Sequence, residues 1–456
     1  MKKYYLAIDI GASSGRHILG WQEDGVMKTE EIYRFSNGPT QVGGSLKWNI
    51  AYLFQEILNG LKKAGELRKI PYSVGVDTWG VDYVLLDEND DVIDGAYCYR
   101  DARTEKTIPQ VHSILPFEKL YEKTGTGFAN FNTIYQLLDD KTTGRMDKAK
   151  SFLMLPDYFH FRLTGEKKQE YTNATTTGMV NALTHEWDEE ILSALGYKKE
   201  LFGSLSQPTT LVGEFTDEVK KYVGYKAKVV LPATHDTASA VLAAPLEGKT
   251  PYISSGTWSL LGVEQENVHT DENAMQSGYS NEGSINYCFR FQKNIMGLWM
   301  IQQVRHELED KYSFVELAKL ARENPIEDEI SVNDNCFFAP ESMIKEIHNA
   351  VGRELSVGET AYCILNNLAK DYARSLDALE KTTGEKYDVL NIIGGGSKNE
   401  LLNELTKKYT KKRIITGPTE GTAIGNLIMQ MVGAGALANL ADGRKMVKNS
   451  FDIQEI

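Results

Sequence analysis

Cysteine is scarce in this sequence, and its spacing excludes two kinds of site. The four cysteines lie far apart and form no C-x-x-C pair: Cys98, Cys288, Cys336 and Cys363. Structural zinc sites and disulfide frameworks both depend on closely or regularly spaced cysteines. We therefore expect neither in this protein.

The chain also lacks net positive charge. The formal net charge is -13, whereas a nucleic-acid-binding domain carries a dense basic patch. The densest basic run, residues 407–413, is expected on a solvated helix end and the start of a strand. The sequence therefore predicts no nucleic-acid partner.

Long hydrophobic runs are nearly absent. Residues 422–441 carry no charge over a length that can span a bilayer. Asn426, Gln430, Asn439 and the glycines among them indicate a buried helix instead. The N-terminus leads directly into an alternating strand that contains Asp9, unlike a signal peptide. We expect no membrane partner and a cytoplasmic location.

The length of 456 residues is too great for one hydrophobic core, so two or three domains are expected. The first half contains expected strands and one long helix, followed by a mostly helical stretch: strands at 3–10, 16–21, 26–35, 72–77, 81–86 and 229–231, the helix at 46–67, and the helical stretch at 101–203. The second half contains a second set: strands at 252–255, 259–264, 389–393 and 413–416, and helices at 359–381, from 398 and from 420. Each half opens with a hairpin and closes with strand–helix units. The sequence thus predicts two related α/β domains, 1–245 and 246–456, that face one another across a cleft.

Asp236 stands at the centre of the most informative stretch, V-V-L-P-A-T-H-D-T-A-S-A at residues 229–240. A short strand, a turn and a helix are expected there, with Asp236 in the first helical turn. Free backbone N–H groups at a helix start favour the charged form of a carboxylate, so we expect Asp236 to be ionised. Such an aspartate is often no more than a favourable helix start. The polar neighbours His235 and Thr237, and the small residues after them, favour a site for a small polar molecule instead.

The stretch D-I-G-A-S-S-G-R at residues 9–16 is a candidate phosphate-binding turn. Gly11 and Gly15 allow backbone N–H groups to converge on phosphate oxygens, and the serines and Arg16 add donors. Asp9 at the strand end is suited to Mg²⁺, which uses few protein carboxylates. An ordinary hairpin with a polar turn remains the alternative. A second turn of this type is expected at residues 254–257.

Three further stretches are candidates for ligand contact. D-T-W-G-V-D at 77–82 and Y-R-D-A-R-T at 99–104 suit a sugar, since an aromatic ring stacks on its apolar face while charged groups bind its hydroxyls. A buried Trp79 beneath a salt-bridged loop is the alternative. Gly394–Gly396 brings backbone close to a flat group such as adenine, or allows a helix to cross the sheet. Asn294 is expected to cap a helix while contacting substrate, and Gln302 to reach a nucleotide.

These motifs together resemble the FGGY-type carbohydrate kinases, which carry the same motifs in the same order. The resemblance extends from about residue 4 to 432 and includes H-D-T-A-S-A, S-S-G-T-W-S-L, N-I-M-G-L-W, G-G-G-S and E-G-T-A-I-G-N. It implies two actin-like (ribonuclease H-like) domains that use ATP and Mg²⁺. Within the family the wording is most similar to members that phosphorylate L-rhamnulose at O1. An Ala is more usual than Gly421, a change at a helix start that affects little.

The resemblance also implies residue roles. Asp236 would accept the proton and, with Asp9, bind Mg²⁺. The ketose would be contacted by Gly80, His235, Asp236, Thr237 and Asn294. ATP would be contacted by Ala12, Ser13, Ser14, Gly15, Arg16, Thr257, Gln302 and Gly395. The first domain would provide the sugar side and the first phosphate turn, and the second domain the nucleotide side.

Two alternatives remain open at this point. Another ketose, such as L-fuculose or xylulose, fits the residue types equally well. An actin-like nucleotide-binding protein without a sugar substrate would also use two phosphate turns, but it would not need Trp79, Arg100 or the cluster around Asp236. The sequence does not indicate an oligomeric state.

Overall fold

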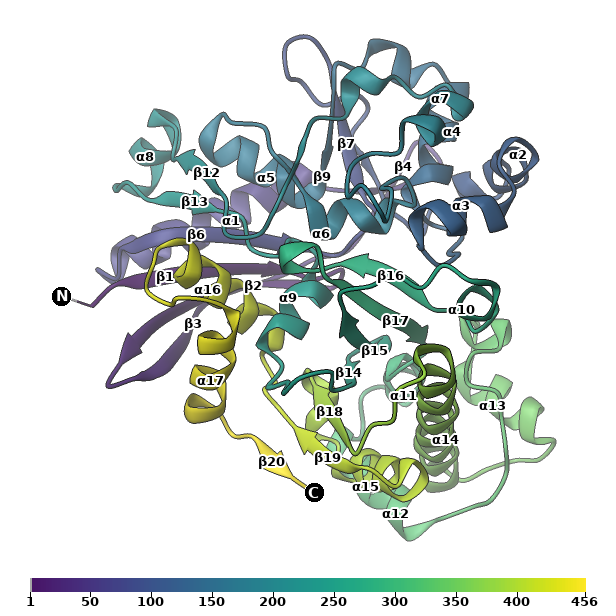
Figure 1. Ribbon diagram of the computed structural model, residues 1–456. Helices are drawn as coiled ribbons and strands as arrows, with labels where there is room; N and C mark the ends of the chain where they lie inside the picture. The colour runs from purple at the N-terminus through teal and green to yellow at the C-terminus, as the bar shows by residue number, and fades with distance from the viewer. Residues whose placement is uncertain (1) are drawn as a thin grey trace. The chain divides into compact units, whose positions relative to one another are not determined.

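The computed structural model describes residues 2–456, and the chain divides into two compact units. Unit 1 comprises Met1–Ala243, Gln265–Phe291 and Thr422–Ser450. Unit 2 comprises Ala244–Glu264, Gln292–Gly421 and Phe451–Ile456. Each unit contains strands and helices in alternation (Figure 1).

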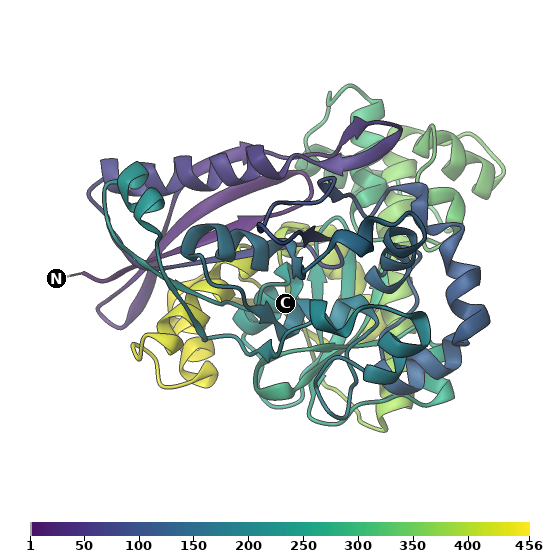
Figure 2. The same cartoon turned by 90° about the horizontal axis from the view of Figure 1, so that it is seen from above.

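Unit 1 is built on a six-stranded sheet in the order β12-β13-β6-β1-β2-β3. The strands are β1 (Tyr4–Ile10), β2 (Ser14–Glu23), β3 (Val26–Ser36), β6 (Pro71–Thr78), β12 (Leu211–Glu214) and β13 (Lys228–Val230). The first three run antiparallel as the sequence predicts, whereas β6 runs parallel to β1, and β13 parallel to β6. Apolar side chains of the central strands pack with α1 (Ile50–Glu66), which lies along the sheet in Figure 2.

The start of α1 corrects the sequence prediction. Residues 46–48 were expected to be helical, but they belong to β5 (Ser45–Trp48), which pairs with β4 (Thr40–Val42) and β8 (Ala96–Tyr97). Asn49 then caps the helix by accepting a hydrogen bond from the Tyr52 amide at 3.0 Å. The apolar residues before Asn49 fit a helical period, but the pairing partner β8, which decides their structure, is remote in sequence.

The stretch 101–203 is mostly helical, as predicted, and surrounds a core of its own. Its helices are η1 (Ala102–Thr104), α2 (Thr107–Ile114), α3 (Phe117–Thr124), α4 (Thr133–Thr142), η2 (Arg145–Lys148), α5 (Leu155–Thr164), α6 (Tyr171–Ala174), η3 (Thr175–Thr177), α7 (Glu189–Leu195) and η4 (Lys199–Leu201). A strand, β9 (Ser151–Met154), pairs with β7 (Tyr83–Leu86), and β10 (Gln169–Glu170) pairs with β11 (Leu205–Ser206). Unit 1 also contains α8 (Asp217–Val223), α9 (Asp236–Ala243), α10 (Glu272–Gln276), β16 (Ser280–Gly283), η5 (Ile285–Tyr287) and α17 (Leu440–Ser450).

The second sheet has the order β16-β17-β15-β14-β18-β19-β20. Its other strands are β14 (Tyr252–Ser255), β15 (Ser259–Gln265), β17 (Phe289–Ile295), β18 (Val389–Ile393), β19 (Arg413–Thr416) and β20 (Gln454–Glu455). The hairpin β14–β15 is antiparallel, and β18 and β19 follow in parallel, which repeats the arrangement of β1, β2 and β6. The helices of unit 2 are α11 (Trp299–Glu307), α12 (Phe314–Glu323), η6 (Asn335–Phe337), α13 (Met343–Val351), α14 (Val357–Thr383), η7 (Gly395–Lys398) and α15 (Glu400–Thr410).

The long helix α14 forms as the sequence predicts. Ser356 and Glu359 make the expected capping box, and Gly384 ends the helix in the left-handed conformation at φ +70°. The helix expected from residue 398 begins instead at Glu400, after η7, with Asn399 as its cap.

Helix α16 (Gly421–Gly433) belongs to unit 1 apart from its first residue and lies beside β1 and β2 (Figure 1). Gln430 Nε2 donates to Leu6 O at 2.9 Å, and Asn426 Nδ2 donates to Gly75 O at 3.1 Å. The first part of the uncharged run is therefore a buried helix whose amides bind the sheet, as expected. The helix ends at Gly433, however, and Asn439 is exposed, where it accepts a hydrogen bond from the Asp442 amide at 3.0 Å. Among residues 2–456, no helix is both long and apolar enough to cross a membrane.

Close packing joins α16 to α9. A Cβ atom at Gly425 would lie 1.8 Å from the backbone oxygen of Ser239, far inside van der Waals contact. Only glycine lets these two helices approach this closely, so Gly425 fixes where α9 begins relative to the sheet.

The buried carboxyl of Asp77 is also held by α16. Asn426 Nδ2 donates to its Oδ2 at 2.5 Å, while its Oδ1 has no hydrogen-bond partner among residues 2–456. Burial raises the pKa of Asp77 well above its usual value, and the negative charges of Asp9 and Asp236 raise it further.

The variant Gly425→Ala is expected to lower the free energy of unfolding by about 1–3 kcal/mol, because the added methyl group forces α9 and α16 apart. Gly38→Ala is the control, since a Cβ there meets nothing within 4 Å. Denaturant unfolding of the two variants measures the difference. Equal stability would show that α9 and α16 are not in close contact at Gly425.

The variant Asp77→Asn is expected to gain stability over the wild type as pH rises. Folded Asp77 keeps its proton above pH about 4, where the unfolded chain releases it, so wild-type stability falls with rising pH. Replacement by Asn removes that loss. Melting temperatures at several pH values between 4 and 8 test this, with the exposed Asp217→Asn as the baseline. A difference that stays constant with pH would contradict the raised pKa.

Candidate active site

Three carboxylates of unit 1 lie together at the ends of its central strands. Asp9 and Asp77 occupy neighbouring positions on the parallel strands β1 and β6, and Asp236 begins α9. The charges of Asp9 and Asp236 both act on Asp77. The structure thus brings the predicted metal ligands, Asp9 and Asp236, close together and adds Asp77 beside them.

The pKa of Asp236 shifts in the direction opposite to the one expected from a helix start. Burial raises the pKa above the usual value, and neighbouring His235 and the Thr237 amide only partly oppose this. Its side chain is still 30% exposed. The reason is that loss of water around a carboxylate outweighs the favourable field of one short helix. A raised pKa makes the ionised form a better proton acceptor.

Hydrogen bonds orient the Asp236 carboxylate through one oxygen. The Thr237 amide donates to Oδ1 at 2.6 Å and the Thr237 hydroxyl donates to the same atom at 3.2 Å. His235 Nε2 lies 3.4 Å from Oδ1. Oδ2 accepts no hydrogen bond from the part of the chain that the structure describes. That oxygen is therefore available to a ligand.

The other side of His235 faces a buried ion pair that the sequence analysis missed. Its Nδ1 lies 3.2 Å from Glu282 Oε2 and 3.3 Å from Arg290 Nη2. Arg290 is fully buried and pairs with Glu282 at 3.0 Å. No local pattern in the sequence connects these residues with His235, because they come from β16 and β17.

The predicted phosphate turn adopts a tight hairpin. The Gly11 amide donates to Ser14 O at 2.9 Å, and Asn37 holds the outside of the turn through Gly11 O and Ser13 O. Within residues 2–456, the amides of Ala12 and Ser13 have no hydrogen-bond acceptor. Arg16 donates twice to Asp9 Oδ2, at 2.9 and 2.8 Å. Free adjacent N–H groups beside a guanidinium form an anion-binding arrangement.

The corresponding turn of unit 2 has the same property. Gly256 N donates to Trp258 O at 2.9 Å, which leaves the amides of Thr257 and Trp258 without an acceptor in the described chain. Thr257 Oγ1 donates to Gln302 Oε1 at 3.3 Å, so two predicted nucleotide contacts lie side by side. Gly297 lets α11 approach the turn, since a Cβ there would lie 2.6 Å from Thr257 O.

The glycines at 394–396 have different roles. A Cβ at Gly396 would lie 2.0 Å from Ser255 Oγ, and one at Gly394 would lie 2.8 Å from Ser255 O, so both serve packing. Gly395, the predicted nucleotide contact, has nothing within 4 Å of its Cβ position and faces open space. Packing therefore accounts for Gly394 and Gly396, and the contact of Gly395 with a nucleotide stays a prediction.

Asn294 does not cap a helix, which corrects the sequence prediction. It lies in β17, and α11 begins only at Trp299 with Leu298 before it. The intervening Gly297, at φ +65°, delays the helix start. Asn294 is exposed, and its contact with substrate stays a prediction.

Trp79 is buried, which was the alternative interpretation, so its ring face is not available to stack on a sugar. It is 7% exposed, and its Nε1 donates to Asp82 Oδ2 at 2.8 Å. Asp82 also accepts from Trp48, Tyr99 and Gln136. Burial nonetheless raises the pKa of Asp82 to about 6. Gly80, which follows Trp79 in the chain, lies against Thr176: a Cβ atom at Gly80 would be 3.1 Å from the Thr176 side chain.

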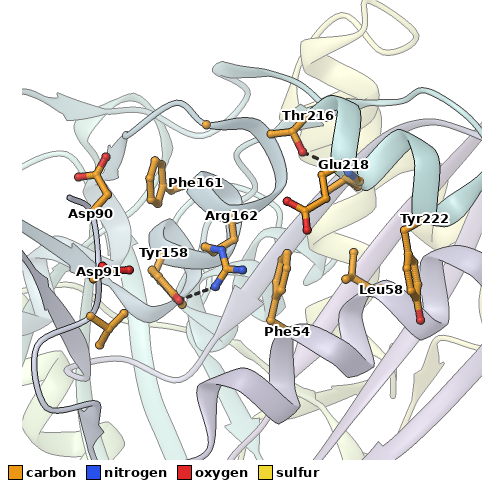
Figure 3. A pocket seen from close by; sticks show the side chains of 13 residues that line it. Phe54, Leu58, Asp90, Asp91, Tyr158, Phe161, Arg162, Thr216, Glu218 and Tyr222 are labelled. Atoms are coloured by element: carbon orange, nitrogen blue, oxygen red, sulfur yellow. Dashed lines mark hydrogen bonds between the residues drawn. The ribbon is translucent and has the colours of Figure 1, made fainter.

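A separate cavity of about 480 Å³ in unit 1 is lined by none of the predicted site residues (Figure 3). Aromatic side chains of α1 and α5 are among its lining residues, and Arg162 donates there to Tyr158 at 2.8 Å. Acidic residues stand around it, among them Asp91 and Glu218. The predicted sugar and nucleotide contacts therefore lie elsewhere.

Comparison with known families identifies two domains in the chain. Residues 4–243 match the N-terminal domain of the FGGY family of carbohydrate kinases, and residues 251–434 match its C-terminal domain. Together these matches extend over most of the sequence.

Curated relatives are similar to the chain over nearly its full length. The chain is 45% identical over 458 residues to a rhamnulokinase of Halalkalibacterium halodurans, covering 99% of this chain and 98% of that one. It is 42% identical to rhamnulokinases of Oceanobacillus iheyensis and Bacillus subtilis, covering 99% of this chain and 98% and 94% of theirs.

Solved structures establish the fold. A xylulose kinase from Lactobacillus acidophilus superposes with a TM-score of 0.82 at 18% identity, covering 100% of this chain and 93% of that one. A Plasmodium falciparum glycerol kinase with ADP gives a TM-score of 0.77 at 14% identity, covering 99% and 94%. The fold is the pair of actin-like (ribonuclease H-like) domains expected from the sequence. The chain belongs to the FGGY family of carbohydrate kinases.

Proposed function

We propose that the protein transfers the γ-phosphoryl group of ATP to O1 of L-rhamnulose, giving L-rhamnulose 1-phosphate and ADP. The relatives named rhamnulokinase, at 42–45% identity over 99% of this chain, support this substrate. The observation that carries the chemistry is Asp236, a carboxylate with a raised pKa and an unengaged oxygen near Asp9 and Asp77.

We assign the substrate contacts as the sequence predicts. Gly80, His235, Thr237 and Asn294 bind the ketose in this proposal. The nucleotide contacts are Ala12, Ser13, Ser14, Gly15 and Arg16 in unit 1, and Thr257, Gln302 and Gly395 in unit 2. The free amides of the two hairpin turns support the phosphate contacts. The domain limits 1–245 and 246–456, the cleft and a cytoplasmic location stay predictions.

Mg²⁺ fits the residues present. Carboxylate oxygens are its preferred protein ligands, and the like charges of Asp9 and Asp236 raise the pKa of Asp77, whose Oδ1 is buried without a partner. Within residues 2–456, no three His, Cys, Asp or Glu side chains are grouped to hold a metal ion by themselves. An ion on Asp9 and Asp236 would therefore need phosphate oxygens as well, and would neutralise phosphate charge.

In the proposed reaction the residues of the chain orient the reacting groups and accept a proton. Asp236 Oδ2 takes the proton of the O1 hydroxyl as the bond from O1 to phosphorus forms and the bond to the β-phosphate oxygen breaks. Thr237 fixes Oδ1 and so points Oδ2 at the hydroxyl. Turn amides and Arg16 stabilise the negative charge of the phosphates.

The function is tested by a panel of ketoses in a coupled assay for ADP. L-rhamnulose is expected to give the highest kcat/KM, above L-fuculose and xylulose. ADP formation that does not depend on any ketose would contradict a sugar kinase and favour an actin-like nucleotide-binding protein.

The variant Asp236→Asn is expected to lose roughly 10²–10⁴-fold in kcat, the usual effect of a positioned proton acceptor. Its KM for ATP should change little. Asp217→Asn is the matched control, since Asp217 also begins a helix but is fully exposed. A kcat for Asp236→Asn within a few-fold of wild type would remove Asp236 from this role.

The variant Gln302→Ala is expected to raise KM for ATP by roughly 5-fold and to leave KM for the ketose unchanged, since one hydrogen bond contributes about 1 kcal/mol. Gln303→Ala, one residue along the same helix α11, is the control. Initial-rate kinetics with each substrate varied in turn measure both constants. An effect on ketose KM alone would refute the nucleotide assignment.

A further inference from the structure

Glu170 is a completely buried carboxylate that no step of the proposed reaction uses. It accepts hydrogen bonds from both the amide and the hydroxyl of Thr172, at 2.8 and 2.6 Å, and from the Asn173 amide at 3.1 Å. It also accepts from the Thr234 amide at 3.1 Å and the Thr234 hydroxyl at 2.7 Å. The two bonds to Thr234 join residues more than sixty positions apart, so Glu170 links distant segments of the chain.

Thr234 is the residue immediately before His235 and Asp236, so its position directs both. Its carbonyl oxygen accepts from the Thr78 amide at 2.9 Å and from Asn173 Nδ2 at 3.3 Å. With Glu170 on its amide and hydroxyl, every polar group of Thr234 is held. The start of α9 therefore has little freedom to turn.

Residues that follow Glu170 also hold the backbone at Gly80, another predicted sugar contact. Thr176 Oγ1 accepts from the Val81 amide at 3.1 Å, and its side chain lies against Gly80. Val81 has φ +66°, a conformation that a β-branched residue adopts only when its surroundings impose it. Thr133 donates to Val81 O at 2.6 Å from the other side.

The same stretch reaches β16. Thr175 Oγ1 accepts from the Gly283 amide at 2.8 Å. Gly283 follows Glu282, which lies 3.2 Å from His235 Nδ1. Residues 170–176, here called the bracing segment, thus bind the backbone beside Gly80, beside His235 and beside the carboxylate that faces His235.

We propose that the bracing segment positions the sugar site, and that Glu170 is a positioning residue that fixes the direction of His235 and Asp236 through Thr234. This inference rests on the proposed function for its kinetic consequences, but its structural part does not. The sequence shows residues 175–178 only as a Thr/Gly-rich break between helices, because the role depends on contacts made after folding.

A carboxylate suits this place better than any other side chain. An ionised carboxylate only accepts hydrogen bonds, so it suits a position where five donors converge, four of them on Oε2. Glutamine at 170 would point its own N–H₂ group at donors of Thr172 or Thr234. A buried donor facing another donor forces one of them to move.

The first experiment compares Glu170→Gln with Glu380→Gln. Glu380 is a buried carboxylate of unit 2 that binds Lys386 at 2.6 Å and Lys412 at 2.7 Å, neither of which is a predicted site residue. Both variants should lower the melting temperature. Only Glu170→Gln should also lower kcat, by roughly 10²-fold as expected for a misplaced catalytic group, and raise KM for the ketose with KM for ATP unchanged. Equal kinetic effects of the two variants would overturn the proposal.

Thr234 variants keep the proposal testable if Glu170→Gln does not fold. Thr234→Val removes the hydroxyl donor and should lower kcat, while Thr234→Ser keeps the hydroxyl and should restore it. Thr406→Val is the control, because Thr406 is equally buried but its hydroxyl donates only to Leu402 O of its own helix. Loss of the same size in Thr234→Ser and Thr234→Val would show that the hydroxyl bond to Glu170 does not position the site.

Amide hydrogen exchange separates this inference from the proposed function. Glu170→Gln should speed exchange at the Thr234 amide, and at the Thr78 amide that donates to Thr234, with or without any substrate. Faster exchange together with a wild type that phosphorylates no ketose would retain the bracing and reject the proposed reaction. Unchanged exchange at both amides would reject the bracing itself.

Discussion

Three carboxyl groups that lie close together govern unit 1. Asp9, Asp77 and Asp236 meet where the central strands end, and burial together with the charges of Asp9 and Asp236 raises the pKa of Asp77. Bringing these groups together is costly, and the surrounding groups offset the cost: Arg16 binds Asp9, Asn426 binds Asp77, and the Thr237 amide binds Asp236. Helix α16 brings one of these partners and, through Gly425, also fixes α9. Stability is thus given up at the point where a phosphoryl-transfer enzyme needs concentrated negative charge near a cation.

Each unit contains the same kind of hairpin turn. In both, an antiparallel hairpin ends in a Gly-containing turn with two adjacent amides that have no acceptor in residues 2–456, at Ala12 and Ser13 and again at Thr257 and Trp258. Such turns stabilise phosphate with backbone dipoles that are fixed before the ligand arrives. The family gives the general activity, that of a carbohydrate kinase.

The sugar side relies on a second layer of buried polar groups. Glu170, Thr175 and Thr176 bind the backbone amides of Thr234, Gly283 and Val81. Two of these amides adjoin the predicted sugar contacts His235 and Gly80. Buried networks of this kind are unfavourable unless every member is satisfied, but when satisfied they specify one geometry. Asp82 acts similarly: it accepts hydrogen bonds from four donors, one of which is Trp79, a residue that the sequence left open as either buried or stacked on a sugar. Precision at the site therefore comes from residues that touch no substrate.

The sequence by itself determined the local features. Neighbours within a few positions determine the hairpins, the capping box at Ser356, the stop at Gly384 and the placement of Asp236 in a first helical turn. The order of motifs that marks the family is also read directly from the sequence. Tertiary structure alone decided the rest: the raised pKa of Asp236, the burial of Trp79, the strand at 46–48, the late start of α11, and the links from Glu170 to Thr234 and from Asn426 to Asp77. Turn and cap preferences act between adjacent residues, whereas loss of water and hydrogen bonding to remote donors exist only once distant segments have packed together.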